Sequence, residues 1–198
     1  ERNDLVIFDP ENGAERARFN LPRQMEDRSR HLCIADFFRP RGADPIGDEQ
    51  KGFPAAAWAN GARDVLPCHV VTMGKVASYH CQRLFKADDY QEYLYFYGLS
   101  VETAEALAEY WHKRIRQQLN IAGHDALRME ELFTQGYQGS RYSFGYAACP
   151  NLDDQRHLQE LLQWKDIGIE LSEEFQLDPE QSTSALIVHH PEASYFNL

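Results

Sequence analysis

The segment from Ser100 to Leu119 constrains the fold most, because it has the clearest periodicity in the chain. Its apolar residues are spaced by three and four positions, which is the pattern of an amphipathic helix. They are Leu107, Ala108, Trp111, Ile115 and Leu119. Ser100 is a suitable N-cap, and Glu102 would interact favourably with the helix dipole. The sequence therefore predicts a helix from Val101 to Leu119 with Trp111 on its buried side.

Segments typical of strands lie on both sides of this helix. Near the start, Asn12-Gly13 separates two such segments and predicts a hairpin. Further strands are expected at residues 31–38, 62–73, 167–171 and 183–189, and further helices at residues 75–86, 125–133 and 153–163. Because helices and strands are interspersed without regular alternation, the predicted fold is α+β, with a mainly antiparallel twisted sheet and flanking helices in a single domain. Residues 39–60 contain several prolines and glycines and are expected to form a long irregular loop.

Composition and charge exclude several classes of partner. A net charge of -11 and a pI near 5.1 argue against binding to a nucleic acid or to an anionic membrane. No apolar segment approaches the length of a membrane span. The four cysteines are widely scattered and form no Cys-x-x-Cys pair, which favours free thiols in a reducing compartment. A cytoplasmic location is therefore expected.

Residues 139–150 form the candidate ligand loop. One arginine, three aromatic residues, two glycines and a proline occur there without a helical or strand period. Glycine permits a close backbone approach and proline stiffens the chain, so the loop could hold Arg141 in a fixed position. A fixed guanidinium can bind a carboxylate with two parallel hydrogen bonds, and neighbouring rings can cover a planar or cationic ligand. A purely structural aromatic-rich turn is the alternative interpretation.

Other patterns favour different chemistry less strongly. Glu109 and His112 have the Glu-x-x-His spacing of dimetal helix bundles, but such a site needs matching ligands, and the nearest similar pair is Asp154 and His157. An exposed Glu/His helix face is the commoner explanation, and a metal-dependent enzyme stays open as an alternative. No family-specific catalytic signature surrounds Cys149, and no glycine-rich phosphate loop occurs. The Asp-x-His-x-x-Gly motif of cobalamin-binding modules is also absent from the sequence.

The chain resembles the activation domain of cobalamin-dependent methionine synthase. The signature is Arg141-x-x-x-Gly145-Tyr146 followed by Ala148-Cys149-Pro150, and four other segments follow the family's order and approximate spacing. They are Cys33-Ile34-Ala35-Asp36-Phe37, Val70-Val71-Thr72-Met73-Gly74, the segment from Glu105 to His112, and His190-Pro191-x-x-x-Tyr195-Phe196. The resemblance covers nearly all of residues 1–198, which it identifies as the C-terminal portion of that domain, lacking its N-terminal part.

The resemblance implies that the chain binds S-adenosylmethionine. Arg141 would pair with the ligand's carboxylate, and Gly145 and Tyr146 would complete the motif, with Tyr146 near the sulfonium. Tyr195 and Phe196 match the pair that lines the adenosyl pocket, and Glu105 matches a glutamate facing the same cleft. No catalytic residue and no metal ligand are implied.

The family's activity implies further partners. The domain would present the methyl group of S-adenosylmethionine for reductive remethylation of cobalamin, which a neighbouring cobalamin-binding domain holds. The isolated chain would then be inactive in the homocysteine reaction. A flavodoxin-like electron donor is expected, and because flavodoxins are usually acidic, Arg39, Arg41 and Lys51 are candidates for its docking patch. A stand-alone module that senses S-adenosylmethionine is the alternative.

Overall fold

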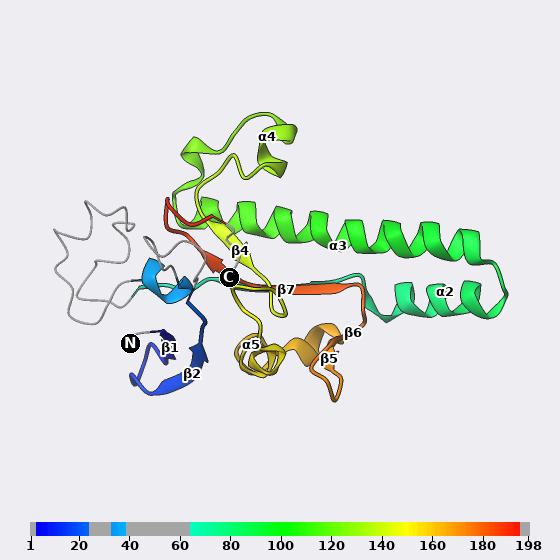
Figure 1. The fold of residues 1–198 in the computed structure, drawn as a ribbon, viewed down its shortest axis with the longest axis horizontal. Coiled ribbons are helices and arrows are strands. Elements are labelled where there is room, and N and C mark those ends of the chain that lie inside the picture. Colours follow the sequence, from blue (N-terminus) through cyan, green and yellow to red (C-terminus); the bar gives the residue numbers. More distant parts are fainter. Residues whose placement is uncertain (1–2, 24–32, 39–63, 195–198) are drawn as a thin grey trace. The chain divides into compact units, whose positions relative to one another are not determined.

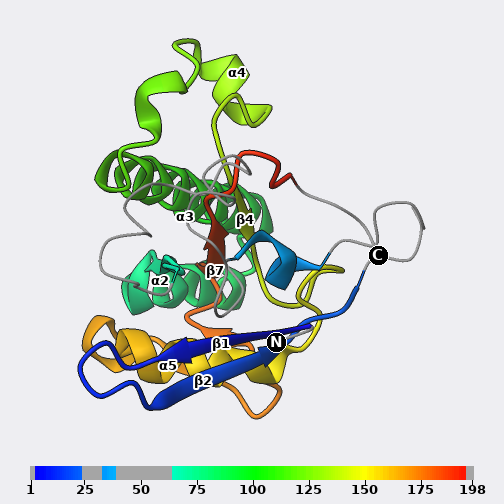
Figure 2. The same cartoon turned by 90° about the vertical axis from the view of Figure 1, so that its left-hand side faces the viewer.

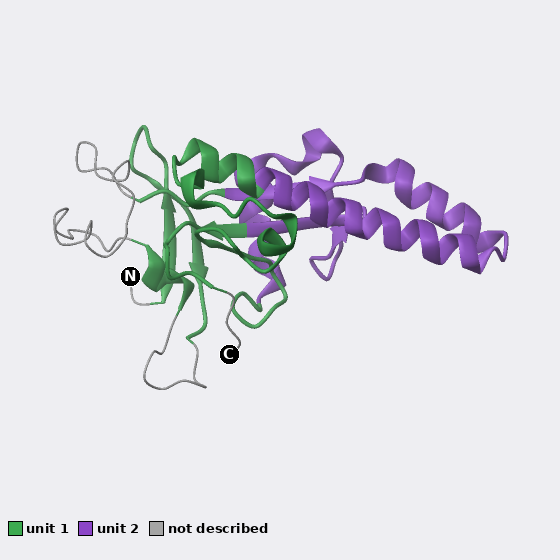
Figure 3. Cartoon of the chain, turned by 90° about the horizontal axis from the view of Figure 1, so that it is seen from above, with its two compact units in different colours: residues 1–67, 112–150, 186–198 green, residues 68–111, 151–185 purple. Residues whose placement is uncertain are grey.

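The chain folds into two compact units in a computed structural model that describes residues 3–23, 33–38 and 64–194. Unit 1 comprises residues 1–67, 112–150 and 186–198, and unit 2 comprises residues 68–111 and 151–185 (Figure 3). Neither unit is continuous in sequence, and one helix and one strand contribute residues to both. A pass along the sequence therefore meets no linker that would mark the division.

Unit 1 begins with the predicted hairpin, formed by β1 (Asp4–Phe8) and β2 (Glu15–Asn20), which pair antiparallel (Figure 2). The turn between them is stabilised by the Asp9 carboxylate, which accepts hydrogen bonds from the backbone N–H groups of Glu11 and Asn12 at 2.9 and 3.2 Å. Gly13 follows with a φ of 73°, a conformation that glycine adopts without strain. The Asn-Gly signal thus identified the hairpin correctly.

The strand predicted at residues 31–38 is wrong, because Ile34–Phe37 form a 3-10 helix, η1. Asp36 explains the difference. Its carboxylate accepts a hydrogen bond from the backbone N–H of Cys33 at 2.8 Å, which closes a short helical turn. Arg23 donates two further hydrogen bonds to the same carboxylate, at 2.6 and 2.9 Å. Three donors on one side chain therefore fix the turn, although the apolar residues around it suggested a strand.

The remainder of unit 1 includes η3 (Ala122–His124), α4 (Met129–Phe133), β4 (Ser140–Tyr142) and the end of β7 (Ser182–Val188). β4 pairs antiparallel with β7, in a register that places Arg141 opposite Ile187. The helix predicted at residues 125–133 is shorter than expected. Asp125 lies outside it, because its carboxylate is bound to Arg116.

Unit 2 contains helix α2 and most of helix α3, which are joined by a short turn, and several shorter elements (Figure 1). They are β3 (Cys68–Thr72), α2 (Gly74–Lys86), α3 (Tyr90–Gln118, up to Trp111), η4 (Leu152–Asp154), α5 (Gln155–Leu162), η5 (Trp164–Ile167), β5 (Glu170–Leu171) and β6 (Leu177–Asp178), with the start of β7. β5 and β6 pair antiparallel. The predicted α+β class with mainly antiparallel strands is confirmed, and the predicted helix at residues 153–163 is present as η4 and α5.

Helix α3 begins at Tyr90, well before the predicted start at Val101. Ser100 is not an N-cap, because its hydroxyl donates a hydrogen bond to the carbonyl oxygen of Phe96 within the helix at 2.7 Å. Two buried alanines, Ala104 and Ala108, are followed at the same spacing by His112 and Arg116, each 1% exposed. The buried face of α3 therefore consists of two alanines followed by two polar residues, His112 and Arg116.

The prediction that Trp111 is buried is wrong, since its side chain is 46% exposed and lies beside the exposed ring of Tyr110. A periodicity argument counts apolar residues only, and it therefore assigned Trp111 rather than His112 to the core. Within the described residues, no helix is long and apolar enough to cross a membrane. The loop predicted at residues 39–60 lies outside the described residues.

Candidate functional site

The candidate loop starts on β4, which determines how Arg141 is presented. Ser140 and Tyr142 are buried, and Arg141 between them is partly exposed. Because successive side chains of a strand point to opposite faces, the guanidinium lies on the face opposite its two neighbours. The hydroxyl of Tyr142 donates a hydrogen bond to the carbonyl oxygen of Ser194 at 2.7 Å. This bond joins the strand that carries Arg141 to the segment that follows β7.

The turn after β4 is compact. The backbone N–H of Gly145 donates to the carbonyl oxygen of Cys149, and the N–H of Cys149 donates to the carbonyl oxygen of Tyr146, both at 2.9 Å. Phe144, Ala148 and Cys149 are buried, and Phe144 packs against Phe19 with ring centroids 6.1 Å apart. Tyr146 is 60% exposed. The buried residues therefore hold the turn in place, and the ring of Tyr146 faces solvent.

Gly139 is required where the chain enters β4. Its φ is 90°, and a Cβ atom built there would lie 2.4 Å from the carbonyl oxygen of Val188. Gln138 donates a hydrogen bond to the carbonyl oxygen of His189 at 2.8 Å, which holds the same crossing of the two segments. Close backbone contact therefore leaves no room for a side chain.

Gly139→Ala is expected to lower the free energy of unfolding by at least about 1–3 kcal/mol, because a non-glycine residue is strained at this φ and a backbone segment must move. Gly98→Ala is the matched control. Gly98 lies within α3, and an added Cβ would meet no atom within 4 Å, so this change should stabilise by about 0.5–1 kcal/mol. Urea denaturation of both variants measures the effect, and equal stabilities would contradict the assigned role of Gly139.

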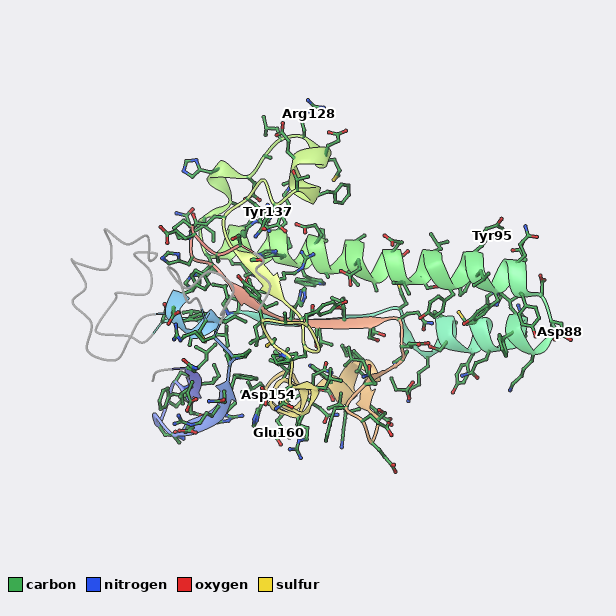
Figure 4. All side chains as sticks on the ribbon, in the orientation of Figure 1. Asp88, Tyr95, Arg128, Tyr137, Asp154 and Glu160 are labelled. Atoms are coloured by element: carbon green, nitrogen blue, oxygen red, sulfur yellow. The ribbon has the colours of Figure 1, made fainter. Side chains whose placement is uncertain are left out.

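A cluster of polar and aromatic side chains lies beside Arg141 in unit 1. The Nη1 atom of Arg141 is 3.4 Å from Nδ1 of His112. The ring of His112 is nearly perpendicular to that of Tyr137, with centroids 5.1 Å apart. The guanidinium carbon of Arg116 lies 3.8 Å from the centroid of the same tyrosine ring. Figure 4 labels Tyr137, which lies beside the C-terminal end of α3.

The cluster ends in a buried ion pair. Arg116 donates from Nε to both carboxylate oxygens of Asp125 at 3.1 Å and from Nη2 to Oδ2 at 2.9 Å. The two side chains are 1% and 8% exposed. A cation and a carboxylate removed from water need such close geometry to offset their lost hydration. The pair therefore fixes the position of Arg116, and through it the position of Tyr137.

The predicted site residues lie in different parts of the chain. Arg141, Gly145 and Tyr146 lie on one continuous segment of unit 1. Glu105 lies on α3 in unit 2, and its side chain is exposed. Tyr195 and Phe196 lie outside the described residues, as do Arg39, Arg41 and Lys51.

The sequence argument missed His112 and Tyr137 as neighbours of Arg141. One signal was available. His112 and Arg116 are spaced by four residues, and they continue the Ala104 and Ala108 side of the helix. Charged or polar residues that extend a row of small residues on one helix face can be buried when another segment supplies their partners.

A metal site and a cavity were the other candidates for a functional site in the part of the chain that the structure describes. Within the described residues, no group of three or more His, Cys, Asp and Glu side chains could hold a metal ion. A cavity of about 370 Å³ lies in unit 2, lined by residues of α2 and α3 and by the segment before β7, among them Phe85, Tyr93, Tyr97 and Glu180. The pKa of Tyr97 is raised, mainly because the hydroxyl is partly removed from water and to a smaller extent because Glu180 is negatively charged. None of the predicted ligand residues lines this cavity.

The fold and the loop define the class, an α+β domain with a long helix and an arginine-bearing signature loop. The chain belongs to the vitamin B12-dependent methionine synthase activation domain family, whose model matches residues 1–198. It is 44% identical to the methionine synthases of Mycobacterium tuberculosis and Mycobacterium leprae over alignments of 206 positions. These alignments cover the whole chain but only 16% of each relative.

A solved structure is similar over nearly the whole chain. It is the MetH reactivation domain bound to AdoHcy, with a TM-score of 0.81 and 27% sequence identity. The match covers 98% of this chain and 56% of the solved one. The family assigned from the sequence motifs is therefore confirmed by both sequence and structure.

Proposed function

We propose that this chain binds S-adenosylmethionine and presents its methyl group for the reductive remethylation of cobalamin in a vitamin B12-dependent methionine synthase. The observation that carries the proposal is the similarity to a reactivation domain bound to AdoHcy. AdoHcy is S-adenosylmethionine without the sulfonium methyl group, so a site for one has the shape and most of the polar groups needed for the other. Membership in the activation domain family supports the same ligand.

Arg141 is the proposed carboxylate-binding residue. It is partly exposed and held on a strand between two buried neighbours, which suits a guanidinium that must meet a ligand in one orientation. The exposed ring of Tyr146 follows five positions later, after a rigid turn. An aromatic face beside a positively charged sulfur is favourable. For Glu105, Tyr195 and Phe196, a role in the same site rests on the family resemblance alone.

The chain's part in the reaction is positioning. Cobalamin, held by a neighbouring domain, supplies the metal centre to which the methyl group is transferred. The residues of this chain bind the carboxylate, orient the sulfonium methyl and cover one side of the ligand. Transfer of the methyl group leaves a neutral thioether, and no general base is needed. The rate advantage then comes from holding the methyl donor at short range and in line.

Reduction of cobalamin requires an electron donor, and a flavodoxin-like protein is the proposed one. This part of the proposal rests on the family resemblance. The negatively charged chain would need a local basic surface to dock an acidic donor.

Replacement of Arg141 tests the ligand assignment. Arg141→Lys keeps the positive charge but loses the two parallel hydrogen bonds, so we expect S-adenosylmethionine to bind at least tenfold more weakly. The melting temperature should change little, since the side chain is partly exposed. Titration calorimetry measures the affinity. Arg114→Lys, the same change at an exposed position of α3, is the control and should bind like the wild type. An unchanged affinity in folded Arg141→Lys would remove Arg141 from the site.

A further inference from the structure

We propose that His112 is a positioning residue for Arg141. In this arrangement the imidazole accepts a hydrogen bond from the guanidinium and holds it in the orientation that receives the ligand's carboxylate. The inference rests on the proposed function, in which Arg141 binds that carboxylate. It adds a buried residue of α3 to the residues that the family resemblance assigns to the site.

The contact defines the state of the imidazole. An arginine side chain has only donors, so the 3.4 Å contact between Nη1 of Arg141 and Nδ1 of His112 requires an unprotonated Nδ1. In the proposed arrangement His112 is the neutral tautomer with its proton on Nε2. A neutral imidazole adds no charge that would compete with the ligand's carboxylate or repel the guanidinium. Because the acceptor is uncharged, a hydrogen bond to it orients Arg141 and leaves its positive charge available to the ligand.

His112 is itself held firmly. Its side chain is 1% exposed and packs edge-on against Tyr137. The same tyrosine ring contacts the guanidinium of Arg116, one helical turn further along α3, and Arg116 is bound to Asp125 by three hydrogen bonds. Each member of this series is fixed by the next, so Nδ1 of His112 is presented to Arg141 from a rigid position.

Rigidity matters because arginine is a long side chain with several rotatable bonds. A guanidinium that is already oriented loses less conformational freedom when the ligand binds, and more of the interaction energy appears as affinity. Removal of the acceptor at His112 should therefore weaken ligands that use Arg141 and leave other ligands unaffected. A side chain that only fills the core would instead affect all ligands alike.

Two variants and two ligands separate these roles. His112→Phe keeps a flat ring against Tyr137 but has no acceptor. His112→Asn places its amide oxygen near the position of Nδ1. S-Adenosylmethionine carries the carboxylate. 5'-Deoxy-5'-methylthioadenosine shares the adenosyl group and the methyl-bearing sulfur, which is there a neutral thioether, but it lacks the carboxylate. The affinity of each variant for each ligand is measured by titration calorimetry, after circular dichroism confirms the fold.

We expect His112→Phe to bind S-adenosylmethionine about two- to tenfold more weakly, the usual size of one lost hydrogen bond. Its affinity for methylthioadenosine should match the wild type. His112→Asn should restore most of the S-adenosylmethionine affinity. In an Arg141→Ala background, His112→Phe should have no further effect, because the residue through which it acts is gone. If His112→Phe does not fold, His112→Gln replaces it, since its amide falls near Nε2 instead and should lose the same affinity.

The possible results distinguish the two levels of the proposal. If the wild-type chain does not bind S-adenosylmethionine, the proposed function fails. If it binds but Arg141→Ala leaves the affinity unchanged, Arg141 is not the carboxylate-binding residue, and the role of His112 falls with it. If Arg141→Ala weakens binding but His112→Phe does not, the proposed function stands and the role of His112 is overturned. The role is also overturned if His112→Asn loses as much affinity as His112→Phe, or if both ligands are weakened equally.

Discussion

Asp125→Ala is expected to lower the free energy of unfolding by about 3–5 kcal/mol, one of the largest effects of any single change in unit 1. Asp125 accepts three hydrogen bonds from Arg116, and the arginine side chain is 1% exposed. Without the carboxylate, a guanidinium stays in a site from which water is excluded. Chemical denaturation measures the loss.

A double variant separates the charge from the packing. Arg116→Met with Asp125→Ala removes both ions and keeps much of the arginine's apolar volume against Tyr137. It should be more stable than Asp125→Ala alone, since the cost of a single unpaired ion exceeds the net contribution of a buried pair. Asp125→Asn keeps hydrogen-bond acceptance but loses the charge, and it should lie between the wild type and Asp125→Ala. A double variant as unstable as the sum of its two single changes would contradict this account.

The parts of the fold that the sequence predicted are those that local interactions determine. The first hairpin follows from Asn12-Gly13. The helix predicted from Val101 to Leu119 is present as the second half of α3. The candidate loop followed from its composition, because glycine, proline and a single arginine restrict a loop wherever it occurs. These features depend on residues that are close in sequence.

The parts that the sequence did not predict depend on distant partners. The turn at Ile34–Phe37 exists because Arg23 and Cys33 both bind Asp36. His112 is buried because Tyr137 and Arg141, more than twenty residues away, lie against it. A pattern of apolar residues contains no information about such contacts.

The candidate site shows how these two kinds of determination combine. The loop presents Arg141 and Tyr146 through local interactions, whereas Arg141 also contacts His112 of α3, a helix whose Arg116 pairs with Asp125. Sequence motifs therefore indicate candidate ligand residues such as Arg141. They do not indicate buried neighbours such as His112, which has no role in the signature.

The two described tryptophans provide the sharpest test of which aromatic residues belong to the core. Trp164 is fully buried in η5, whereas Trp111 is 46% exposed on α3. Trp164→Ala should lower the free energy of unfolding by about 3–5 kcal/mol, because the large side chain leaves a cavity that a close-packed interior fills only partly. Trp111→Ala, the matched control, should cost less than about 1 kcal/mol. Urea denaturation of both variants measures the difference.

A third variant, Trp164→Phe, separates the contribution of the indole N–H from that of the ring's packing. The indole N–H of Trp164 is buried and makes no hydrogen bond among the described residues, so the folded state carries the cost of a desolvated donor. Trp164→Phe removes that donor together with part of the ring, and the two effects oppose each other. It should therefore be markedly more stable than Trp164→Ala. If Trp111→Ala proved as damaging as Trp164→Ala, the exposed side of α3 would have to be covered in the folded protein, and the periodicity argument that placed Trp111 in the core would be right after all.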